Sequence, residues 1–402
     1  VRRFRLGNPQ PAAAAEIVST AIESTETMLD RQISRSCWAA YIATVAFFAA
    51  FYALIIPLPL YMQGVGIPDW QIGIVMGAFA TASLIGRPFA GALTDRYGVR
   101  PVILFGTVAL AIGSLGVAQT TTVALLFVLR MLQAAGYVAY TTAATALVAG
   151  LVPAEARGTA VARYGTAANV AITLVPLVIN ALLPRIGAQG AFVAAGSAAV
   201  VAGLIIWQII PASPTKSAAI VWAELVHFPR MLWAPMVTAF CFGVGFGAYF
   251  QYLPLLADRR DIADLGVVYV CYGIAIVATR MLTGRFLDGA DRRVVLVPAA
   301  VVTALGMLVF ARADTIWLLC LAAACTAIGG GLSHPALIAI HVDTLPQRGK
   351  AVAAFYIAFD VGIGLGSWLL GAVLQAGGLT IMFAVAAVVS LLGAVTQRRI
   401  PR

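Results

Sequence analysis

The feature that most constrains this chain is a series of long apolar runs of similar length. Each run holds roughly 20 residues, enough for an α-helix to cross the ~30 Å hydrocarbon core of a bilayer. The runs lack the alternation of polar and apolar residues found in the strands of transmembrane barrels. We place twelve runs, at residues 38–61, 70–93, 101–119, 122–150, 157–183, 189–210, 233–256, 264–287, 294–312, 315–343, 350–376 and 379–397. The sequence therefore predicts an all-α integral membrane protein with twelve transmembrane helices.

The composition excludes a soluble globular protein. Of the 402 residues, 61% are hydrophobic and only 10% are charged, which is typical of a membrane protein. The five cysteines show no CxxC spacing, so we expect neither a disulfide framework nor a metal centre, and no cofactor. The first apolar run begins near Trp38 and is long enough to span the membrane, which argues against a cleavable signal peptide. Residues 1–36 are predicted to form a tail.

The net charge of +10 reflects membrane topology rather than binding of nucleic acid. Most Lys and Arg residues outside the apolar runs fall in the tails and in the loops on one side of the predicted membrane. The opposite side carries only four: Arg185, Arg259, Arg260 and Arg312. Cytoplasmic loops are enriched in Lys and Arg. We therefore expect a multi-pass protein of the cell (plasma or inner) membrane with both termini in the cytoplasm.

The chain contains an internal repeat marked by charged residues. The stretch GRPFAGALTDRYGVRPVIL (86–104) has a degenerate copy in TRMLTGRFLDGADRRVVLV (279–297). A second pair of segments aligns Arg157 with Arg348 and Asn169 with Asp360. Two landmarks repeated in the same order indicate a duplicated six-helix unit. We predict a tail (1–36), a first six-helix bundle (37–210), a cytoplasmic linker (211–232) and a second bundle with a short tail (233–402).

The charged motif resembles the signature loop of the major facilitator superfamily. That loop lies between helices 2 and 3, and the chain matches it with Gly91, Asp95, Arg96, Gly98 and Arg100. The degenerate echo of this superfamily follows helix 8, where the chain has Gly284, Asp288 and Arg293. The stretch Arg130-x-x-Gln133-x-x-Gly136 is similar to its second motif. The resemblance implies the fold of this superfamily and transport of a small molecule. One departure is Pro176, which lacks the neighbouring glycines of the drug/proton antiporter motif.

The signature loop has two interpretations. Gly91 would let helices pack closely, and Asp95 would pair with an arginine or a helix N-terminus of the opposite half in one conformation only. In that case the loop gates transport. Alternatively, Arg96 and Arg100 only fix the topology.

Asp360 is the one acidic residue that lies deep within an apolar run. An isolated carboxylate there is costly in its charged form, which suits a group that takes up and releases a proton. The alternative is a structural Asp bonded to a neighbouring helix, since Asn169 occupies the equivalent point of the repeat. Tyr356, Gly364 and Ser367 fall on the same helical face as Asp360.

Other polar residues lie at membrane depth. An arginine such as Arg130 must face protein or water; the resemblance implies a role in proton transfer or substrate binding, and a fixed ion pair is the alternative. Gln133 shares its stripe, and Asn169 belongs to a stripe suited to a polar ligand or to helix packing. His334 either titrates or packs as a neutral ring.

These features predict a secondary active transporter that works by alternating access between two halves. Its sharpest form is proton-coupled export (antiport) of a small amphipathic drug or metabolite; the alternative is a proton-coupled importer or a uniporter of a sugar or organic acid. No nucleotide-binding loop of the form G-x-x-x-x-G-K-[ST] occurs, and no cluster of His, Asp and Ser suggests an enzyme. The expected partners are a small-molecule substrate, protons and the lipid bilayer, and we expect a monomer.

Overall fold

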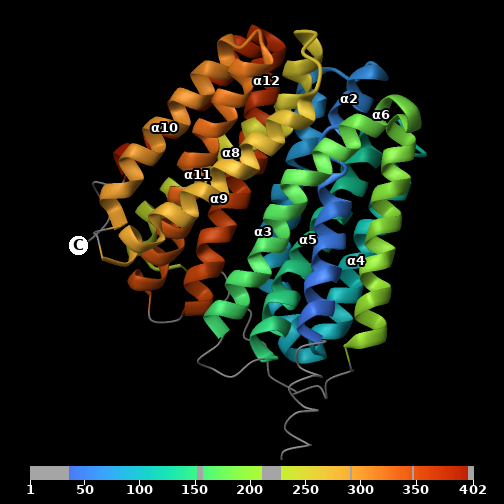
Figure 1. The fold of residues 1–402 in the computed structure, drawn as a ribbon, viewed down its shortest axis with the longest axis vertical. Helices are drawn as coiled ribbons and strands as arrows, with labels where there is room; N and C mark the ends of the chain where they lie inside the picture. The colour runs from blue at the N-terminus through green and yellow to red at the C-terminus, as the bar shows by residue number, and fades with distance from the viewer. Residues whose placement is uncertain (1–35, 152–156, 211–227, 290–291, 346–347, 397–402) are drawn as a thin grey trace, which may run out of the picture.

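The structure, a computed structural model, describes residues 36–151, 157–210, 228–289, 292–345 and 348–396, and the regular structure in these ranges is helical (Figure 1). The first span, Ser36–Gly64, ends in α2 (Pro57–Gly64). The helices that follow are α3 (Asp69–Tyr97), α4 (Val99–Val117), α5 (Val123–Gly150), α6 (Arg157–Ile209), the short η2 (Arg230–Leu232), α8 (Trp233–Arg259), α9 (Leu265–Gly289), α10 (Arg292–Arg312), α11 (Ile316–Thr344) and α12 (Arg348–Thr396). By length and composition, nine helices in these ranges can cross a membrane, or ten when the bent α3 is counted as one span.

Two of the nine spans are too long for a single crossing. Tyr164–Ile209 and Ala351–Thr396 each hold 46 residues, or about 69 Å of helix at 1.5 Å per residue. Each is broken near its middle by a glycine with a left-handed backbone, Gly187 (φ 65°) and Gly378 (φ 75°). Only glycine adopts this conformation without steric cost. Both breaks fall in the gaps that the sequence predicts, and Figure 1 shows the two arms of α6 joined at the top.

The first predicted span is not one continuous helix. The structure has a helix over residues 36–52, a turn over 53–56 and then α2. Proline lacks an N–H to bond to the preceding turn, and its ring crowds the carbonyl four residues earlier. Pro57 therefore begins a new helix rather than continuing the first one. Similarly, α3 bends by 47° between Arg87 and Phe89, at the position of Pro88.

The described helices form two groups, which we call the first group (residues 36–210) and the second group (residues 228–396); they lie side by side in Figure 1. The end of the first span, α2, packs on α8, and two larger helix pairs join the groups: α3 packs on α12, and α6 packs on α9. The sequence repeat relates these pairs to each other, because α9 corresponds to α3 and α12 to α6. The closest contacts correspond as well. A Cβ at Gly364 would collide with Ala80, and a Cβ at Gly273 would collide with Thr173.

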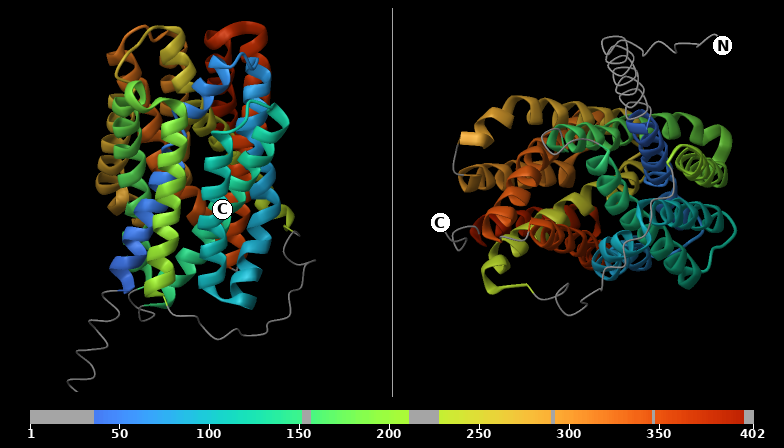
Figure 2. Two further views of the ribbon diagram at one scale, coloured as in Figure 1. Left: turned by 90° about the vertical axis from the view of Figure 1, so that its right-hand side faces the viewer. Right: turned by 90° about the horizontal axis from the view of Figure 1, so that it is seen from below.

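We call the end of the bundle at which α2 ends and the arms of α6 and of α12 join the loop end, and the opposite end, at which the first span begins and α12 begins and ends, the terminus end (Figure 2). At the loop end the two groups are joined by polar contacts. Arg259 donates both Nη groups to the carboxylate of Asp69, and Gln63 Nε2 donates to Asp258 at 2.8 Å. Nearer the middle, Trp368 Nε1 donates to the carbonyl of Ile74 at 3.1 Å. The groups are thus held together over the half of the bundle nearest the loop end.

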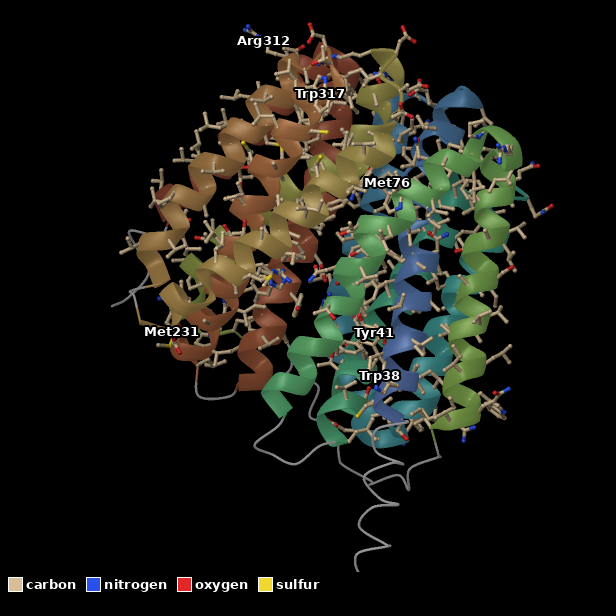
Figure 3. The ribbon with its side chains drawn as sticks, in the orientation of Figure 1. Trp38, Tyr41, Met76, Met231, Arg312 and Trp317 are labelled. Carbon is tan, nitrogen blue, oxygen red and sulfur yellow. The ribbon has the colours of Figure 1, made fainter. Side chains whose placement is uncertain are left out.

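Large apolar side chains cover the outside of the bundle. Met281, Leu282 and Trp317 are more than 70% exposed, at 79%, 72% and 78%. Such an exposed apolar surface is expected where hydrocarbon rather than water surrounds the protein. Trp38 and Trp317 lie near opposite ends of the bundle in Figure 3, at the level where indole rings prefer the membrane interface. The protein is therefore a multi-pass membrane protein.

Candidate functional site

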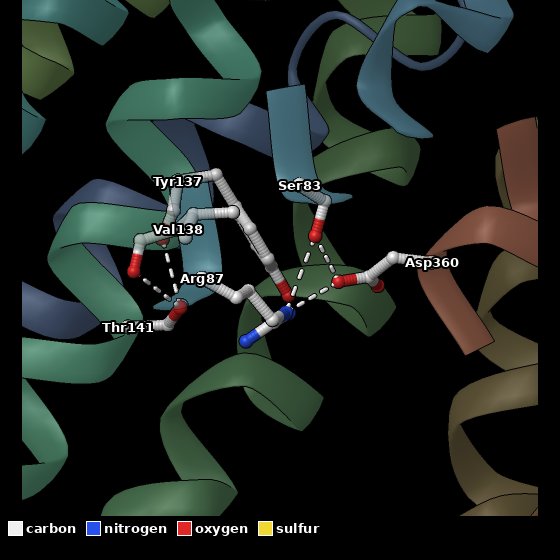
Figure 4. A network of polar contacts seen from close by, with 6 residues as sticks. All are labelled: Ser83, Arg87, Tyr137, Val138, Thr141 and Asp360. Carbon is white, nitrogen blue, oxygen red and sulfur yellow. Dashed lines mark hydrogen bonds and ion pairs between the residues drawn. The ribbon is translucent and has the colours of Figure 1, made fainter. Parts of the chain in front are cut away.

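The candidate site is built around Asp360, which α12 places against α3 at about half the depth of the bundle. Its side chain is buried, with 2% of the residue exposed. Ser83 Oγ and Arg87 Nε, both on α3, donate to Asp360 Oδ2 (Figure 4). Asp360 is therefore bonded to a neighbouring helix, as one of the two interpretations of the sequence has it, and the first group supplies the cation from a position 273 residues away in the chain.

Arg87 is positioned by more than its ion pair. Its Nε also lies 3.2 Å from Ser83 Oγ, one helical turn earlier, and its guanidinium lies 4.4 Å from the ring centre of Tyr356. Tyr356 precedes Asp360 by one turn on α12, so the same helical face holds both partners of the arginine. A cation over an aromatic face is stabilised further when water is excluded. The ion pair is thus enclosed by side chains of both groups.

The remaining residues of that helical face also contact α3, as their spacing predicts. A Cβ at Gly364 would lie 2.7 Å from the carbonyl oxygen of Gly77, so no larger residue fits this close approach. The carbonyl of Ser367 accepts a bond from Tyr252 Oη at 2.6 Å, and it lies next to Gly73. One face of α12 therefore combines close backbone packing near the loop end with a charged contact at mid-depth.

Arg130 and Gln133 form a second buried polar cluster, on α5. Arg130 Nη1 donates to Gln133 Oε1 at 2.9 Å, and only 6% and 0% of the two residues are exposed. Arg130 Nε and Gln133 Nε2 have no hydrogen-bond partner among the described residues. Arg130 lies about 10 Å from the start of α5 at the loop end and makes no described contact with Asp360. The structure therefore does not join these two predicted site residues.

His334 packs against aromatic side chains of α12, the helix that carries Asp360. Its ring meets Phe355, Tyr356 and Phe359 edge-on, with ring centres 5.1, 6.0 and 6.1 Å apart. His341 also packs on Phe355, at 5.7 Å, and its Nδ1 lies 2.7 Å from the carbonyl of Leu337. His334 is thus placed near the site, whereas His341 is bonded to its own helix. Asn169, on α6, is half-buried, and its carbonyl accepts a bond from Thr173 Oγ1 at 2.6 Å.

The predicted gating loop lies at the terminus end of α3. Gly98 has φ 86° and separates α3 from α4, which explains why the motif requires glycine there. The expectation of close packing at Gly91 was wrong, since a Cβ built there meets nothing within 4 Å. Arg100 Nη2 donates to the carbonyl of Trp207 at 2.6 Å, and the guanidinium lies 4.6 Å from that ring. Arg100 thus braces its own group in this conformation.

The remaining loop residues make no described contact between the groups. Asp95 and Arg96 are exposed, and Arg96 lies 5.3 Å from the ring of Tyr97, its neighbour in the chain. In the echo, Gly284 and Asp288 lie in α9 and Arg293 in α10, but their side chains fall outside the described part of the structure. The predicted tail 1–36, apart from its last residue, and the linker residues 211–227 also fall outside it.

Sequence reasoning missed the partners of Asp360 and the contacts at the loop end. Arg87 belongs to the repeated stretch 86–104 but was given no role, although an arginine deep in an apolar run is a signal in its own right. Ser83, Asp69 and Arg259 gave no such signal, because charged and hydroxyl residues are ordinary at these depths or helix ends. Among the described residues, no group of three His, Cys, Asp or Glu side chains could hold a metal ion.

Comparison with known proteins places this geometry in a family. The chain matches the Major Facilitator Superfamily over residues 40–288 and 260–401. Its relatives include the staphylopine export protein of Staphylococcus aureus (23% identical, 82% of this chain and 87% of that protein) and the multi-drug resistance efflux pump PmrA of Streptococcus pneumoniae (24%, 80% and 86%). A chloramphenicol resistance protein of Pseudomonas aeruginosa is 25% identical over 57% of this chain and 56% of that protein.

Solved structures share the fold. The nucleoside transporter NupG superimposes with a TM-score of 0.76 at 15% identity, covering 91% of this chain and 100% of that one. A bacterial homologue of the human lysosomal transporter Spinster gives 0.71 at 14% identity, covering 92% and 98%. The family match extends over nearly the whole described chain, with its apolar helices and its repeat. The chain therefore belongs to the Major Facilitator Superfamily and is a membrane transporter rather than an enzyme.

Proposed function

We propose that this protein exports a small amphipathic molecule in exchange for protons, using twelve transmembrane helices in two six-helix bundles. This number is supported by the ten spans of the described residues, with the bent α3 counted as one, of which the two hairpins at Gly187 and Gly378 would each cross twice. Export is supported by the relatives in Staphylococcus aureus and Streptococcus pneumoniae, which are an export protein and an efflux pump. The observation that carries proton coupling is the buried ion pair between Arg87 and Asp360, which joins the two groups.

The ion pair can respond to a proton because it contains a single acid. When Asp360 is charged, Arg87 and Ser83 are bonded to it and the groups are held together at mid-depth. Protonation removes the negative charge and with it most of the attraction for Arg87, so the contact between the groups weakens. One proton taken up by Asp360 therefore changes the relative stability of two arrangements of the bundles.

The described contacts between the groups correspond to one state of such a cycle. The positive-inside bias puts the terminus end in the cytoplasm, so a bundle joined at the loop end is closed toward the outside. In an antiport cycle this is the state after Asp360 has released its proton to the cytoplasm. The same state would accept substrate from the cytoplasm, with Arg130, Gln133, Asn169, His334 and Tyr356 available as polar groups at membrane depth.

Asp95, Arg96 and Arg100 are proposed to gate the cytoplasmic side. Asp95 is exposed in this conformation, as expected of a group that pairs with the opposite half only when the terminus end closes. The test is cysteine cross-linking between the bundles at the terminus end in Asp95→Asn. Unchanged cross-linking and transport rates would leave the loop with a role in topology alone. We also propose that the protein works as a monomer in the cell membrane.

The test of proton coupling uses everted vesicles with an acid interior reported by a quenched pH dye. Dyes, antibiotics, sugars and organic acids are added in turn to wild type, to Asp360→Asn and to Asp314→Asn, which removes an exposed acid at the loop end. We expect one or more compounds to restore fluorescence in wild type and Asp314→Asn but not in Asp360→Asn. Full activity of Asp360→Asn would refute proton transfer through Asp360. No response to any compound would favour import or uniport, measured next as labelled uptake in right-side-out vesicles.

A further inference from the structure

The ion pair at Asp360 has a counterpart in the repeat that lacks its acid. The repeat aligns Arg87 with Arg280 and Asp360 with Asn169. Ser83, the second donor to Asp360, corresponds to Ile276. The α6–α9 contact therefore keeps the arginine of the α3–α12 contact and has replaced both of its polar partners.

The two arginines occupy equivalent positions in the structure, not only in the alignment. Arg87 follows Ala80 by seven residues, or about two helical turns, and Ala80 is the residue that contacts Gly364 of α12. Arg280 follows Gly273 by the same seven residues, and Gly273 is in contact with Thr173 of α6. Since α9 lies on α6 in the register in which α3 lies on α12, Arg280 is brought to the same depth between the groups.

Arg280 has no partner for its charge in the described part of the structure. No hydrogen bond or ion pair joins it to a described residue, and the side chain is half-buried. It lies 15 residues into α9, about 23 Å along a helix of 25 residues. An unpaired arginine at membrane depth costs several kcal/mol unless it meets water or an anion.

The described residues on which the charge of Arg280 acts come from both groups, and none of them is an acid; Asp360, paired with Arg87, acts on one of them, Tyr356. Its charge acts on Tyr52 of the first group and on Tyr272, His334 and Tyr356 of the second. Tyr52, His334 and Tyr356 are half-buried, as expected of residues next to space between the groups. These are rings that can lie against an aromatic or apolar body, with hydroxyl and imidazole groups at their edges.

The net charge of the bundle interior also favours an anionic ligand. Among the described side chains at membrane depth, the charged ones are Arg87, Arg130, Arg280 and Asp360. Asp360 neutralises Arg87, so two positive charges are left over. An interior with excess positive charge favours an anion over a neutral or cationic guest.

We propose that Arg280 binds the acidic group of the transported molecule, which is an organic anion with an aromatic or apolar body. A guanidinium can hold a carboxylate through two parallel hydrogen bonds, so the substrate supplies at Arg280 what Asp360 supplies at Arg87. The tyrosines and His334 then contact the body of the substrate. This inference rests on the proposed transport of a small molecule between the groups, but it does not depend on the direction of transport or on protons.

The test measures binding rather than transport, with probes that differ only in charge. Purified protein in lipid nanodiscs is titrated with dansylglycine and with dansylglycinamide, followed by dansyl fluorescence, and then with 1-naphthoate and 1-naphthamide as competitors. Hydrogen bonds to charged groups contribute roughly 1.5–3 kcal/mol, so we expect each acid to bind at least about tenfold more tightly than its amide. Equal affinities for acid and amide in both pairs would overturn the proposal.

Three variants locate the preference. Arg280→Gln is expected to remove this preference, because it should weaken binding of the acid but not binding of the amide. Asn169→Asp keeps Arg280 but supplies the carboxylate that this copy of the repeat lacks, so it should also remove the preference. This second variant tests the inference even if Arg280→Gln does not fold. Arg312→Gln, which removes an exposed arginine at the end of α10, should retain it. A preference that survives in Arg280→Gln or Asn169→Asp would refute the inference.

The two proposals fail separately. Selective binding of acids without any proton-linked fluorescence response would refute proton coupling and leave the anion site standing. Conversely, the fluorescence response could be lost in Asp360→Asn while acids and amides bind with equal affinity. That pair of results would support proton coupling and refute the anion site.

Discussion

The contacts between α3 and α12 and between α6 and α9 are two copies of one design that have diverged in charge. Both approach closely through small residues, at Ala80 and Gly364 in one copy and at Gly273 and Thr173 in the other. In contrast, both ion pairs found among the described side chains involve α3, at Asp69 and at Arg87. Packing has therefore been conserved between the copies while electrostatics has not. In the α3–α12 contact Asp360 neutralises the charge of Arg87, whereas in the α6–α9 contact the charge of Arg280 has no described acidic partner.

This difference changes what each arginine does for stability. At Arg87, removal of either partner leaves a charge buried without compensation, which costs more than the pair itself contributes. At Arg280 no described partner would be lost. The three predictions below test this contrast, from the largest expected effect to the smallest.

The largest effect is expected at the buried ion pair. Arg87→Gln should lower the stability of the protein by roughly 3–5 kcal/mol, because Asp360 is then left charged and buried. The double variant Arg87→Gln/Asp360→Asn should recover most of this loss, since no charge remains. The measurement is the midpoint of thermal unfolding in detergent for both single variants and the double variant. Additive losses would show that the two side chains are not coupled.

A smaller effect is expected from the glycines that allow close approach. In Gly364→Ala the added methyl meets the backbone of Gly77 and Ala80, and overpacking of this kind costs about 1–3 kcal/mol. In Gly273→Ala the nearest atoms all belong to the side chain of Thr173, which can move more easily than backbone, so the cost should be smaller. Gly165→Ala, on α6, is the matched control because nothing lies within 4 Å of its Cβ. Unfolding midpoints in the reverse order would contradict this account of the interface.

The smallest effect is expected at Arg280 in the absence of ligand. Arg280→Gln should change the unfolding midpoint by less than the equivalent of about 1 kcal/mol, because the arginine makes no described hydrogen bond or ion pair. The same unfolding assay, run beside Arg87→Gln, makes the comparison direct. A destabilisation as large as that of Arg87→Gln would mean that Arg280 has a protein partner in the working transporter.

The sequence predicts the parts of the fold that depend on local properties. Apolar length predicts the spans, and the gaps before residues 189 and 379 predict the breaks at Gly187 and Gly378. The repeat predicts that Asp360 and Asn169 are equivalent. The turn at 53–56 was missed because an apolar run shows length but not the local effect of Pro57.

The site could be predicted only in part, because its contacts join the two groups. Burial of Asp360 follows from its depth in one helix. Its pairing with Arg87 depends on how α12 sits against α3, which no local pattern specifies. The opposite error occurred at Gly91, where a small residue suggested close packing that is absent in this conformation. Arg280 was overlooked for a similar reason, since its lack of an acid becomes visible only when the two interfaces are compared.

The glycine hairpins in α6 and α12 also limit what can reach the protein from the loop end. A single residue turns each chain, so these connections expose almost no extended backbone. The other links there, such as residues 65–68 and 313–315, are only a few residues long. A protease needs a flexible stretch of chain to bind, and an antibody needs a surface to cover. Seen from this side, the transporter presents mainly helix ends, so we expect it to offer little surface to either.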